Sequence, residues 1–166
     1  MSEAAPTQTV KVLFVCMGNI CRSPAAQAVM EHLIAQRGLS DRIICDSAGT
    51  IGYHSGDRSD PRIRAAGTKR GYRFEHFARQ IHKRDFVEFD YIVAMDDDNF
   101  HDIKRIQPNE ARARVSLLMR HMENPSHDFV PDPYYGGPEG FELVLDLVEQ
   151  ACDALLDQIA GQHRLP

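Results

Sequence analysis

The chain contains 166 residues, with 24 acidic and 19 basic side chains and a net charge of −5 when histidine is neutral. Hydrophobic residues make up 43% and charged residues 26%, proportions typical of a globular domain with its own core. The acidic balance argues against nucleic acid or a membrane surface as a partner, because both require a basic protein surface. No apolar run reaches the roughly 18 residues of a membrane span, and no signal-peptide pattern opens the chain. We therefore expect one cytoplasmic domain over residues 1–166, in which residues 1–9 are a disordered lead-in.

Strands and helices alternate along the predicted chain. A nearly continuous β-branched and aromatic run at residues 10–15 predicts a strand buried on both faces, which favours a parallel sheet. Ser23 and Pro24 predict the N-cap and first residue of a helix that ends at Gly38. The remaining predictions are a strand over 43–47, a helix from Pro61 to about Gly71, a strand over 89–95, a helix over 96–105, a strand over 115–118 and a helix over 141–159. This alternation predicts an α/β fold in three layers.

The turn after the first predicted strand reads CMGNICRS over residues 16–23. Such a turn lies at the carboxyl edge of the sheet, where backbone N–H groups at a helix N-terminus favour an anion. Neither a Walker pattern nor a complete dinucleotide pattern is present, so a phosphate site is favoured over a nucleotide site. The same N–H groups favour the thiolate of Cys16, and Arg22 can bind two phosphate oxygens as a planar fork. The pattern predicts a cysteine nucleophile beneath a bound phosphoryl group.

A thiolate that attacks phosphorus needs a general acid to protonate the departing oxygen. Asp132 is the candidate, because the prolines on either side hold it in the loop predicted over residues 131–138. The same carboxylate can then activate water against the cysteinyl-phosphate, which makes the reaction two displacements through a covalent intermediate. From the residues alone, a turn-forming role for Asp132 remains the alternative.

The other cysteines favour different roles. Cys45 and Cys152 have no close partner and are predicted to be core residues. For Cys21, simple packing and a redox role are both open. A zinc site at Cys16 and Cys21 is not expected, because no second close pair of cysteines or histidines supplies the remaining ligands.

Five motifs together resemble the low-molecular-weight protein tyrosine phosphatases. In chain order they are C-x₅-R-S at 16–23, DSAGT at 46–50, ARQI at 78–81, FDYIVAMD at 89–96 and DPYY at 132–135. Their order and spacing match that family from about residue 10 to residue 160. The YYGG turn at 134–137 and the last helix resemble bacterial members.

The resemblance implies a four-stranded parallel sheet flanked by helices, and neither a metal nor another cofactor. It implies tyrosine-phosphorylated proteins as partners, a bacterial tyrosine kinase among them, and inorganic phosphate or a similar oxyanion as an active-site ligand. Carried over by motif, Cys16 is the nucleophile, Arg22 binds phosphate and Asp132 is the general acid. The residues implied to contact phosphate or substrate are Met17, Gly18, Asn19, Ile20, Cys21, Arg22, Ser23, Tyr53, Tyr134 and Tyr135.

The family also implies supporting roles around the nucleophile. Asn19 holds the loop conformation with help from Ser47, and Ser23 donates a hydrogen bond to the thiolate. Cys21 resembles a second loop cysteine that forms a protective disulfide with Cys16 under oxidation, which two nearby thiols make chemically reasonable.

Two positions bear on rival functions. Tyr53 stands where family members often carry tryptophan, so an aromatic wall is kept. Ile20 is bulky and apolar where related arginine phosphatases carry a smaller polar residue, which favours a flat aromatic leaving group.

A thiol-dependent arsenate reductase is the other alternative, but its disulfide relay needs downstream cysteines, and none lies between Cys45 and Cys152. A phosphotyrosine-binding module without catalysis is a further alternative, which the intact catalytic positions disfavour.

Overall fold

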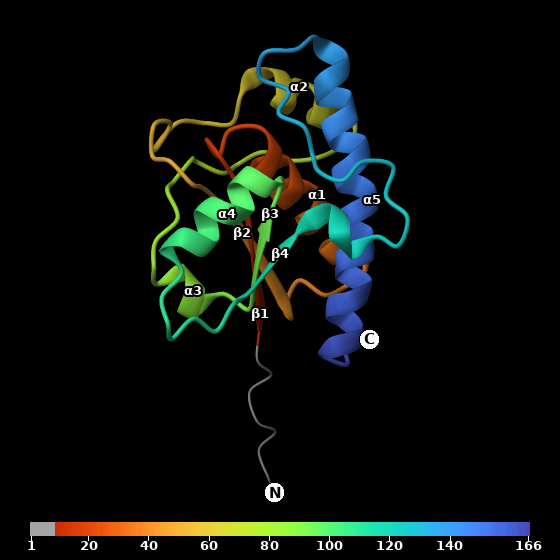
Figure 1. Ribbon diagram of the computed structural model, residues 1–166. Coiled ribbons are helices and arrows are strands. Elements are labelled where there is room, and N and C mark those ends of the chain that lie inside the picture. The colour runs from red at the N-terminus through yellow and green to blue at the C-terminus, as the bar shows by residue number, and fades with distance from the viewer. Residues whose placement is uncertain (1–8) are drawn as a thin grey trace, which may run out of the picture.

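The sheet has four parallel strands in the order β2-β1-β3-β4, with helices on both faces (Figure 1). This computed structural model describes residues 9–166. Its elements are β1 (Val10–Cys16), α1 (Arg22–Gln36), β2 (Ile43–Gly49), α2 (Pro61–Lys69), α3 (Asp85–Glu88), β3 (Tyr91–Ala94), α4 (Asp97–Ile106), β4 (Arg114–Leu117), the 3₁₀ helix η1 (Leu118–His121) and α5 (Pro138–Gln162). The predicted three-layer α/β fold with a four-stranded parallel sheet is confirmed.

β1 is a central strand, and both of its faces are buried. Val12 and Phe14 belong to the core formed with α1 and α5, whereas Leu13 and Val15 belong to the core formed with α3 and α4. Successive side chains of a strand point to opposite faces, so apolar residues at both parities allow β1 to join the two cores. This explains why its sequence is a continuous apolar run rather than an alternating one.

The parallel register brings the carboxyl ends of the strands to one edge of the sheet. Cys16 at the end of β1 pairs with Gly49 at the end of β2, and Val15 pairs with Ala94 of β3. β2 and β3 flank β1 on opposite sides, so the winding of the chain reverses at β1. Ligands of open α/β sheets bind outside the carboxyl ends of strands at such a reversal, and the residues that follow Cys16 lie there.

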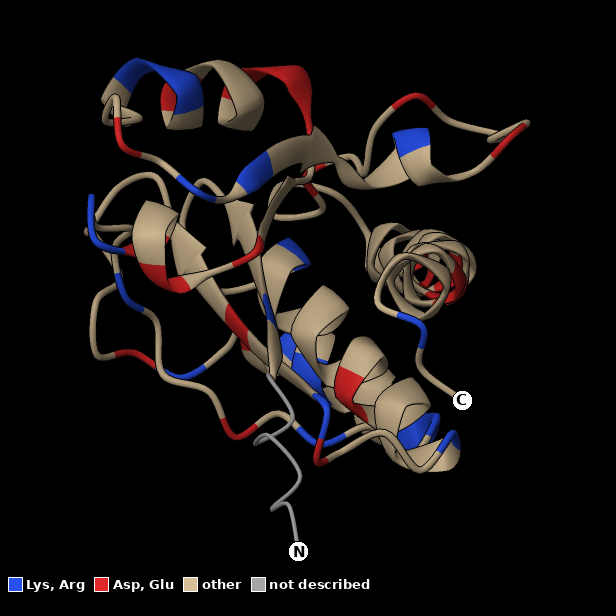
Figure 2. Cartoon of the chain, turned by 90° about the horizontal axis from the view of Figure 1, so that it is seen from below, with Lys and Arg blue, Asp and Glu red and all other residues tan. Residues whose placement is uncertain are grey.

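α5 packs along α1 and carries an acidic side that an arginine of another segment contacts. The guanidinium nitrogens of Arg70, which follows α2, lie 2.8 Å from Glu142, 2.9 Å from Asp146 and 2.9 Å from Glu149. Over residues 9–166, charged residues of both signs are spread along the chain rather than gathered in one segment (Figure 2). The distribution of charge over the chain therefore does not indicate the charge at the site, which depends on the contacts of the site residues.

The start of α1 differs from the prediction. The helix begins at Arg22, and Cys21 takes the N-cap position without a side-chain hydrogen bond. The hydroxyl of Ser23 instead contacts the side chains of Cys16 and Asn19. The prediction of Ser23 as the N-cap is wrong, because buried polar groups of the preceding loop use this hydroxyl.

Other boundaries differ for local reasons. α3 and η1 are absent from the prediction, because a single turn is too short to display a helical period. β3 is shorter than the predicted 89–95, since the N–H of Phe89 donates to the Asp85 carbonyl and closes α3. α5 begins at Pro138, a residue suited to a first helical turn, so the loop predicted over 131–138 ends at residue 137.

The predicted lead-in over residues 1–9 lies outside the described residues, apart from Thr9 directly before β1. None of the helices between residues 9 and 166 combines the length and the apolar character needed to span a membrane.

Candidate active site

A cleft of about 340 Å³ opens at the carboxyl edge of the sheet, above the segment that joins β1 to α1. We call residues 16–23 the anion loop and residues 130–137 the Asp132 loop. The cleft is lined by Cys16, Met17, Gly18, Ile20, Cys21, Arg22, Ile51, Tyr53, His54, Asp132, Tyr134 and Tyr135. The three predicted catalytic residues therefore meet in one cleft.

A larger cavity of about 490 Å³ lies between α1 and residues 71–76. Its lining contains no thiol or hydroxyl group that could act as a nucleophile. The smaller cleft is the better candidate for chemistry, because it alone of these two cavities combines a cysteine, an arginine and a carboxylate.

Cys16 is the last residue of β1 and is only 3% exposed. Its Sγ atom lies 3.0 Å from Oγ of Ser23. Nδ2 of Asn19 donates to the same Oγ at 2.8 Å. The Ser23 hydroxyl can therefore donate its proton to the sulfur, which is nearer than its other acceptor, the Ala48 carbonyl at 3.5 Å. A hydroxyl proton directed at sulfur stabilises a thiolate.

The backbone of the anion loop is held by the residues that follow β2. The N–H of Thr50 donates to the Cys16 carbonyl at 2.9 Å, and the N–H of Ile51 donates to the Met17 carbonyl at 3.1 Å. Gly49 makes this approach possible, because a Cβ atom there would lie 2.7 Å from the Met17 carbonyl oxygen. The end of β2 thus acts as a template for the loop.

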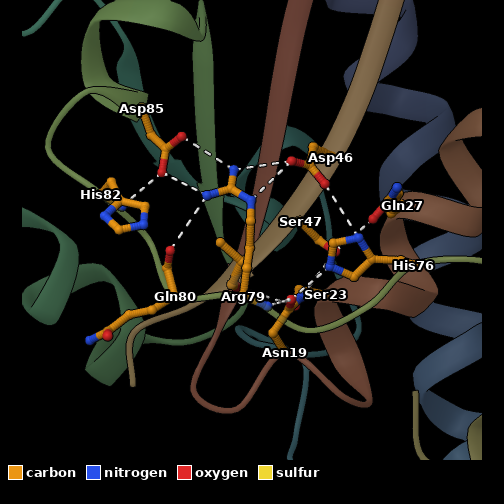
Figure 3. A network of polar contacts seen from close by, with 11 residues as sticks. Asn19, Ser23, Gln27, Asp46, Ser47, His76, Arg79, Gln80, His82 and Asp85 are labelled. Atoms are coloured by element: carbon orange, nitrogen blue, oxygen red, sulfur yellow. Dashed lines mark hydrogen bonds and ion pairs between the residues drawn. The ribbon is translucent and has the colours of Figure 1, made fainter. Parts of the chain in front are cut away.

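Asn19 connects the anion loop to two other segments through one side chain (Figure 3). It is 1% exposed and has a φ of 59°, a left-handed conformation that asparagine tolerates better than most residues. Besides its bond to Ser23, Nδ2 donates to Oγ of Ser47 at 3.0 Å. Its Oδ1 accepts the N–H of Arg79 at 3.0 Å and lies 2.7 Å from Nε2 of His76. Because Oδ1 can only accept, Nε2 of His76 is the donor.

A second layer of polar contacts surrounds Asn19 (Figure 3). Ser47 donates to Oε1 of Gln27 on α1 at 2.6 Å. The guanidinium of Arg79 lies 3.0 Å from Asp46 of β2 and 3.0 Å from Asp85 of α3. Burial lowers the pKa of His76, although the Asp46 carboxylate 3.4 Å from Nδ1 opposes this effect. The loop is therefore held by segments from both faces of the sheet.

Arg22 is 4% exposed and points into the cleft. Its Nη1 donates to Oδ2 of Asp96 at 2.5 Å and to the Val130 carbonyl at 3.2 Å, and its Nη2 lies 3.7 Å from Oδ2 of Asp132. Burial by itself would lower the pKa of Arg22, but the Cys16, Asp96 and Asp132 groups around it raise the pKa above its usual value. The guanidinium is therefore held charged and oriented.

Asp132 lies on a more exposed segment than the anion loop. Its side chain is 42% exposed, and its Oδ1 accepts the N–H of Tyr134 at 3.1 Å. The loop is fixed at its start, where the N–H of buried Val130 donates to the Met95 carbonyl at 2.9 Å. At its tip the Tyr134 and Tyr135 rings pack edge to face with centroids 5.0 Å apart, and Tyr135 is 93% exposed.

Tyr53 and His54 also line the cleft. Their rings pack edge to face with centroids 4.8 Å apart, and Nδ1 of His54 lies 3.3 Å from Asp57. Tyr53 is strongly exposed.

Cys21 faces the same cleft as Cys16, and both are free thiols. Burial, with a smaller contribution from the Asp60 carboxylate, raises the pKa of Cys21. Cys21 therefore stays protonated at neutral pH. Among residues 9–166, no group of three or more His, Cys, Asp or Glu side chains is placed to hold a metal ion.

The structure divides the predicted site residues into two groups. Most line the cleft, whereas the side chains of Asn19, Ser23 and Ser47 are buried outside its lining, where Asn19 contacts both serines. Asp96 is not among the predicted site residues. Asp96 does cap α4 through the Asn99 N–H, yet its second oxygen binds Arg22. Its place directly after β3, at the carboxyl edge, is the signal that could have found it.

Comparisons with known proteins agree with this geometry. The sequence profile of the family described as "Low molecular weight phosphotyrosine protein phosphatase" matches residues 11–165. A low molecular weight protein-tyrosine-phosphatase of Streptomyces coelicolor is 41% identical over 157 residues, which cover 93% of this chain and 96% of the relative.

Solved structures with the same fold include enzymes with different named activities. A protein tyrosine phosphatase from Entamoeba histolytica is 42% identical, with a TM-score of 0.89 over 93% of this chain and 99% of that one. A Drosophila arginine phosphatase is 31% identical, with a TM-score of 0.86 over 90% of this chain and 98% of that one. The predicted family and enzyme class are confirmed: the chain belongs to the low molecular weight phosphotyrosine protein phosphatases, which are hydrolases.

Proposed function

We propose that the chain hydrolyses phosphotyrosine in proteins by two successive displacements at Cys16. In the first, the Cys16 thiolate attacks phosphorus, the S–P bond forms, the bond to the tyrosine oxygen breaks, and Asp132 gives its proton to that oxygen. In the second, Asp132 takes a proton from water, the water oxygen bonds to phosphorus, and the S–P bond breaks to release phosphate and the thiolate. Arg22 and the backbone N–H groups of the anion loop bind the phosphoryl oxygens throughout.

The observation that carries this proposal is the meeting of three groups in one cleft at a helix N-terminus. A phosphoryl group above the Cys16 sulfur would lie beside Arg22, whose Nη2 is 3.7 Å from the Asp132 carboxylate. An acid for the leaving oxygen must be within hydrogen-bond reach of it, and this separation supports Asp132 in that role. The negative charge of a bound phosphoryl group favours the protonated carboxyl that the first step requires.

The rim of the cleft supports an aromatic substrate. Tyr53, Tyr134 and Tyr135 all line the cleft, so a flat phenyl ring that enters it can pack against aromatic side chains. Ile20 adds an apolar surface next to the nucleophile. This lining suits the ring of a phosphotyrosine better than the polar guanidinium of a phosphoarginine.

Trapping the intermediate tests the reaction. Enzyme that is turning over p-nitrophenyl phosphate is quenched in acid, digested and examined by mass spectrometry. We expect one phosphoryl group on the peptide that contains Cys16, and none in the Cys16→Ser protein. A phosphoryl group on another residue, or undiminished turnover by Cys16→Ser, would overturn the proposal.

Matched peptides test the substrate class. Peptides that differ only in carrying phosphotyrosine or phosphoarginine are compared by phosphate release, for the natural chain and for Ile20→Thr. We expect a preference for phosphotyrosine that narrows in Ile20→Thr. A preference for phosphoarginine in the natural chain would replace tyrosine by arginine as the target, and an unchanged ratio in Ile20→Thr would remove Ile20 as its cause.

The partners we propose are tyrosine-phosphorylated cytoplasmic proteins, including a tyrosine kinase. The observation that supports a protein substrate is the open aromatic rim around the nucleophile. Cys16→Ser protein can be used to capture phosphotyrosine proteins from the source cell, with Cys16→Ser/Arg22→Ala as the control that no longer binds phosphate. Absence of a phosphorylated kinase among proteins lost in the control would remove that partner.

A further inference from the structure

The first turn of α2 forms a bridge between the anion loop and the Asp132 loop. At one end, the N–H of Asp60 donates to the Ile20 carbonyl at 2.8 Å, so the N-cap of α2 is bonded directly to the anion loop. Asp60 is buried, and its Oδ1 accepts the N–H of Arg62 at 2.8 Å. The start of α2 is therefore fixed relative to the loop that carries Cys16.

At the other end, the guanidinium of Arg62 reaches the Asp132 loop. Its Nε and Nη2 contact the two carboxylate oxygens of Asp60 at 3.0 and 2.9 Å, and its Nη1 donates to the Tyr134 carbonyl at 3.1 Å. Its Cζ lies 5.2 Å from the centroid of the Tyr134 ring and 4.7 Å from that of Phe141. One planar cation thus joins a buried carboxylate to the backbone and the ring of Tyr134.

Tyr134 links Arg62 to Asp132 through two hydrogen bonds of its backbone. Its carbonyl binds Arg62, while its N–H donates to Oδ1 of Asp132. Arg22 also lies near the Asp132 carboxylate, but its Nη2 is 3.7 Å away, which is too long for a hydrogen bond. The hydrogen bond from the Tyr134 N–H, at 3.1 Å, is therefore the closer of these two contacts to the Asp132 carboxylate.

We infer that Arg62 is a positioning residue that sets the distance between Asp132 and the Cys16 sulfur. The inference rests on the proposed function, since it matters only if Asp132 is the general acid. Arg62 is outside the lining of the cleft and acts through Tyr134. Arginine suits the task because its planar fork contacts Asp60 with two nitrogens while a third reaches the Tyr134 carbonyl, which the single ammonium of lysine cannot do.

The test uses phosphate esters whose leaving groups differ in their need for a proton. Phenyl phosphate needs protonation of a basic phenolate, whereas dinitrophenyl phosphate releases a weakly basic phenolate without help. In Arg62→Ala we expect kcat/KM for phenyl phosphate to fall by about 10- to 100-fold, the scale expected for misplacing a catalytic group by about 1 Å. For dinitrophenyl phosphate we expect a change of less than about threefold. Arg62→Lys should lie between Arg62→Ala and the natural chain.

Arg64→Ala is the matched control. Arg64 lies on the same turn of α2, but its Nε donates to the Ser59 carbonyl at 2.9 Å instead of to Tyr134. Its removal should leave both rates within about twofold of the natural chain, as expected for a surface change away from the site. Thermal unfolding of every variant shows whether a rate loss comes from loss of the fold.

The double variant Arg62→Ala/Asp132→Asn separates the inference from the proposed function. If Arg62 acts through Asp132, its removal costs nothing further once the acid is absent, so the two effects are not additive. Equal losses on both esters in Arg62→Ala, additive losses in the double variant, or an unchanged rate in folded Arg62→Lys would overturn the inference. If Asp132→Asn itself shows no dependence on the leaving group, the acid role in the proposed function fails first. If only Arg62→Ala lacks that dependence, the proposed function stands and the inference alone fails.

Discussion

The anion loop and the Asp132 loop both line the cleft but are held in different ways. In the anion loop, Asn19, Arg22 and Ser23 are buried, and their polar atoms are bonded to residues of β2, α4's N-cap and the segment before α3. In the Asp132 loop, Asp132 and the two tyrosines are exposed, and the contacts that hold them are few.

This difference matches the tasks that we propose for the two loops. A cradle for phosphoryl oxygens works only if its N–H groups are oriented before the reaction, because reorienting them during the reaction would raise the barrier. A loop that supplies one proton to the side chain of another protein must leave room for that protein. The rigid half is therefore built into the sheet edge, and the accessible half is attached to it through Arg22 and Arg62.

The largest expected effect comes from Cys16→Ser. Turnover of p-nitrophenyl phosphate should fall by about 10⁴-fold or more, the scale seen when a nucleophile is removed. Binding of inorganic phosphate should persist, because the N–H groups and Arg22 remain and a serine hydroxyl can still contact Ser23. Calorimetric titration with phosphate checks this. Loss of phosphate binding together with turnover would show that the sulfur is needed to hold the anion loop. It would contradict our separation of the residues that hold the loop from the residue that reacts.

Asp132→Asn should affect rate without affecting stability. We expect kcat/KM for phenyl phosphate to fall by about 10²- to 10⁴-fold, the usual contribution of a general acid. The free energy of unfolding should change by less than about 0.5 kcal/mol, because the side chain is exposed. Denaturant unfolding measures the second quantity. A substantial loss of stability would mean that the Asp132 loop is as integral to the fold as the anion loop.

Asn19→Ala should lower both the activity and the stability of the protein. Several buried groups lose their hydrogen-bond partner, and alanine must adopt the φ of 59°, so we expect a loss of about 3 kcal/mol in unfolding free energy. We also expect a loss of activity of about 10-fold or more, because the loop N–H groups lose their orientation.

Asn19→Gly is the matched control for this variant. Glycine adopts a positive φ without strain, so it removes the side-chain bonds alone and should be less destabilising than alanine. Glycine and alanine variants of equal stability would assign the whole effect to the side-chain bonds, and two variants as stable as the natural chain would contradict the role of the buried network.

The smallest expected effect lies behind the anion loop, on α1. Burial, with repulsion from Asp46 and Glu75, raises the pKa of Glu31 from 4.5 to about 7. Between these values the unfolded chain releases its proton before the folded chain does, so the free energy of unfolding decreases as pH rises. Glu31→Gln should therefore be more stable than the natural chain above a pH of about 7, and equally stable below about 4.5. Glu31 is exposed to solvent, which screens its charge, so we expect a difference of at most about 1 kcal/mol.

Thermal unfolding across this pH range provides the measurement for Glu31. Glu110→Gln, at an exposed surface position, is the control and should follow the natural chain at every pH. A difference between Glu31→Gln and the natural chain that does not vary with pH would contradict the assignment.

Local pattern was enough to predict the frame of the site. The apolar run of β1, followed at once by CMGNICRS, places a cysteine and an arginine between a strand and a helix N-terminus, and both signals act within a few residues. The residues around Asp132 gave weaker support for its role as the general acid, since aspartate between prolines also makes turns. The roles of His76 and Arg62 were not predicted, because nothing in their neighbouring residues shows their partners. Asp96 was also missed, although its place directly after β3 puts it at the carboxyl edge of the sheet.

The sequence by itself determined how the four strands and the longer helices follow one another along the chain. It also determined the anion loop and the candidate residues on it, because periodicity and turn chemistry are short-range. Only the tertiary structure decided which side chains complete the site. Three contacts join residues far apart in the sequence. Arg22 contacts Asp96 across 74 residues, Asn19 contacts His76 across 57, and Arg62 contacts Tyr134 across 72. These pairs form because the parallel sheet brings the carboxyl ends of its strands to one edge, and strand order, unlike a helix period, depends on how the whole core packs.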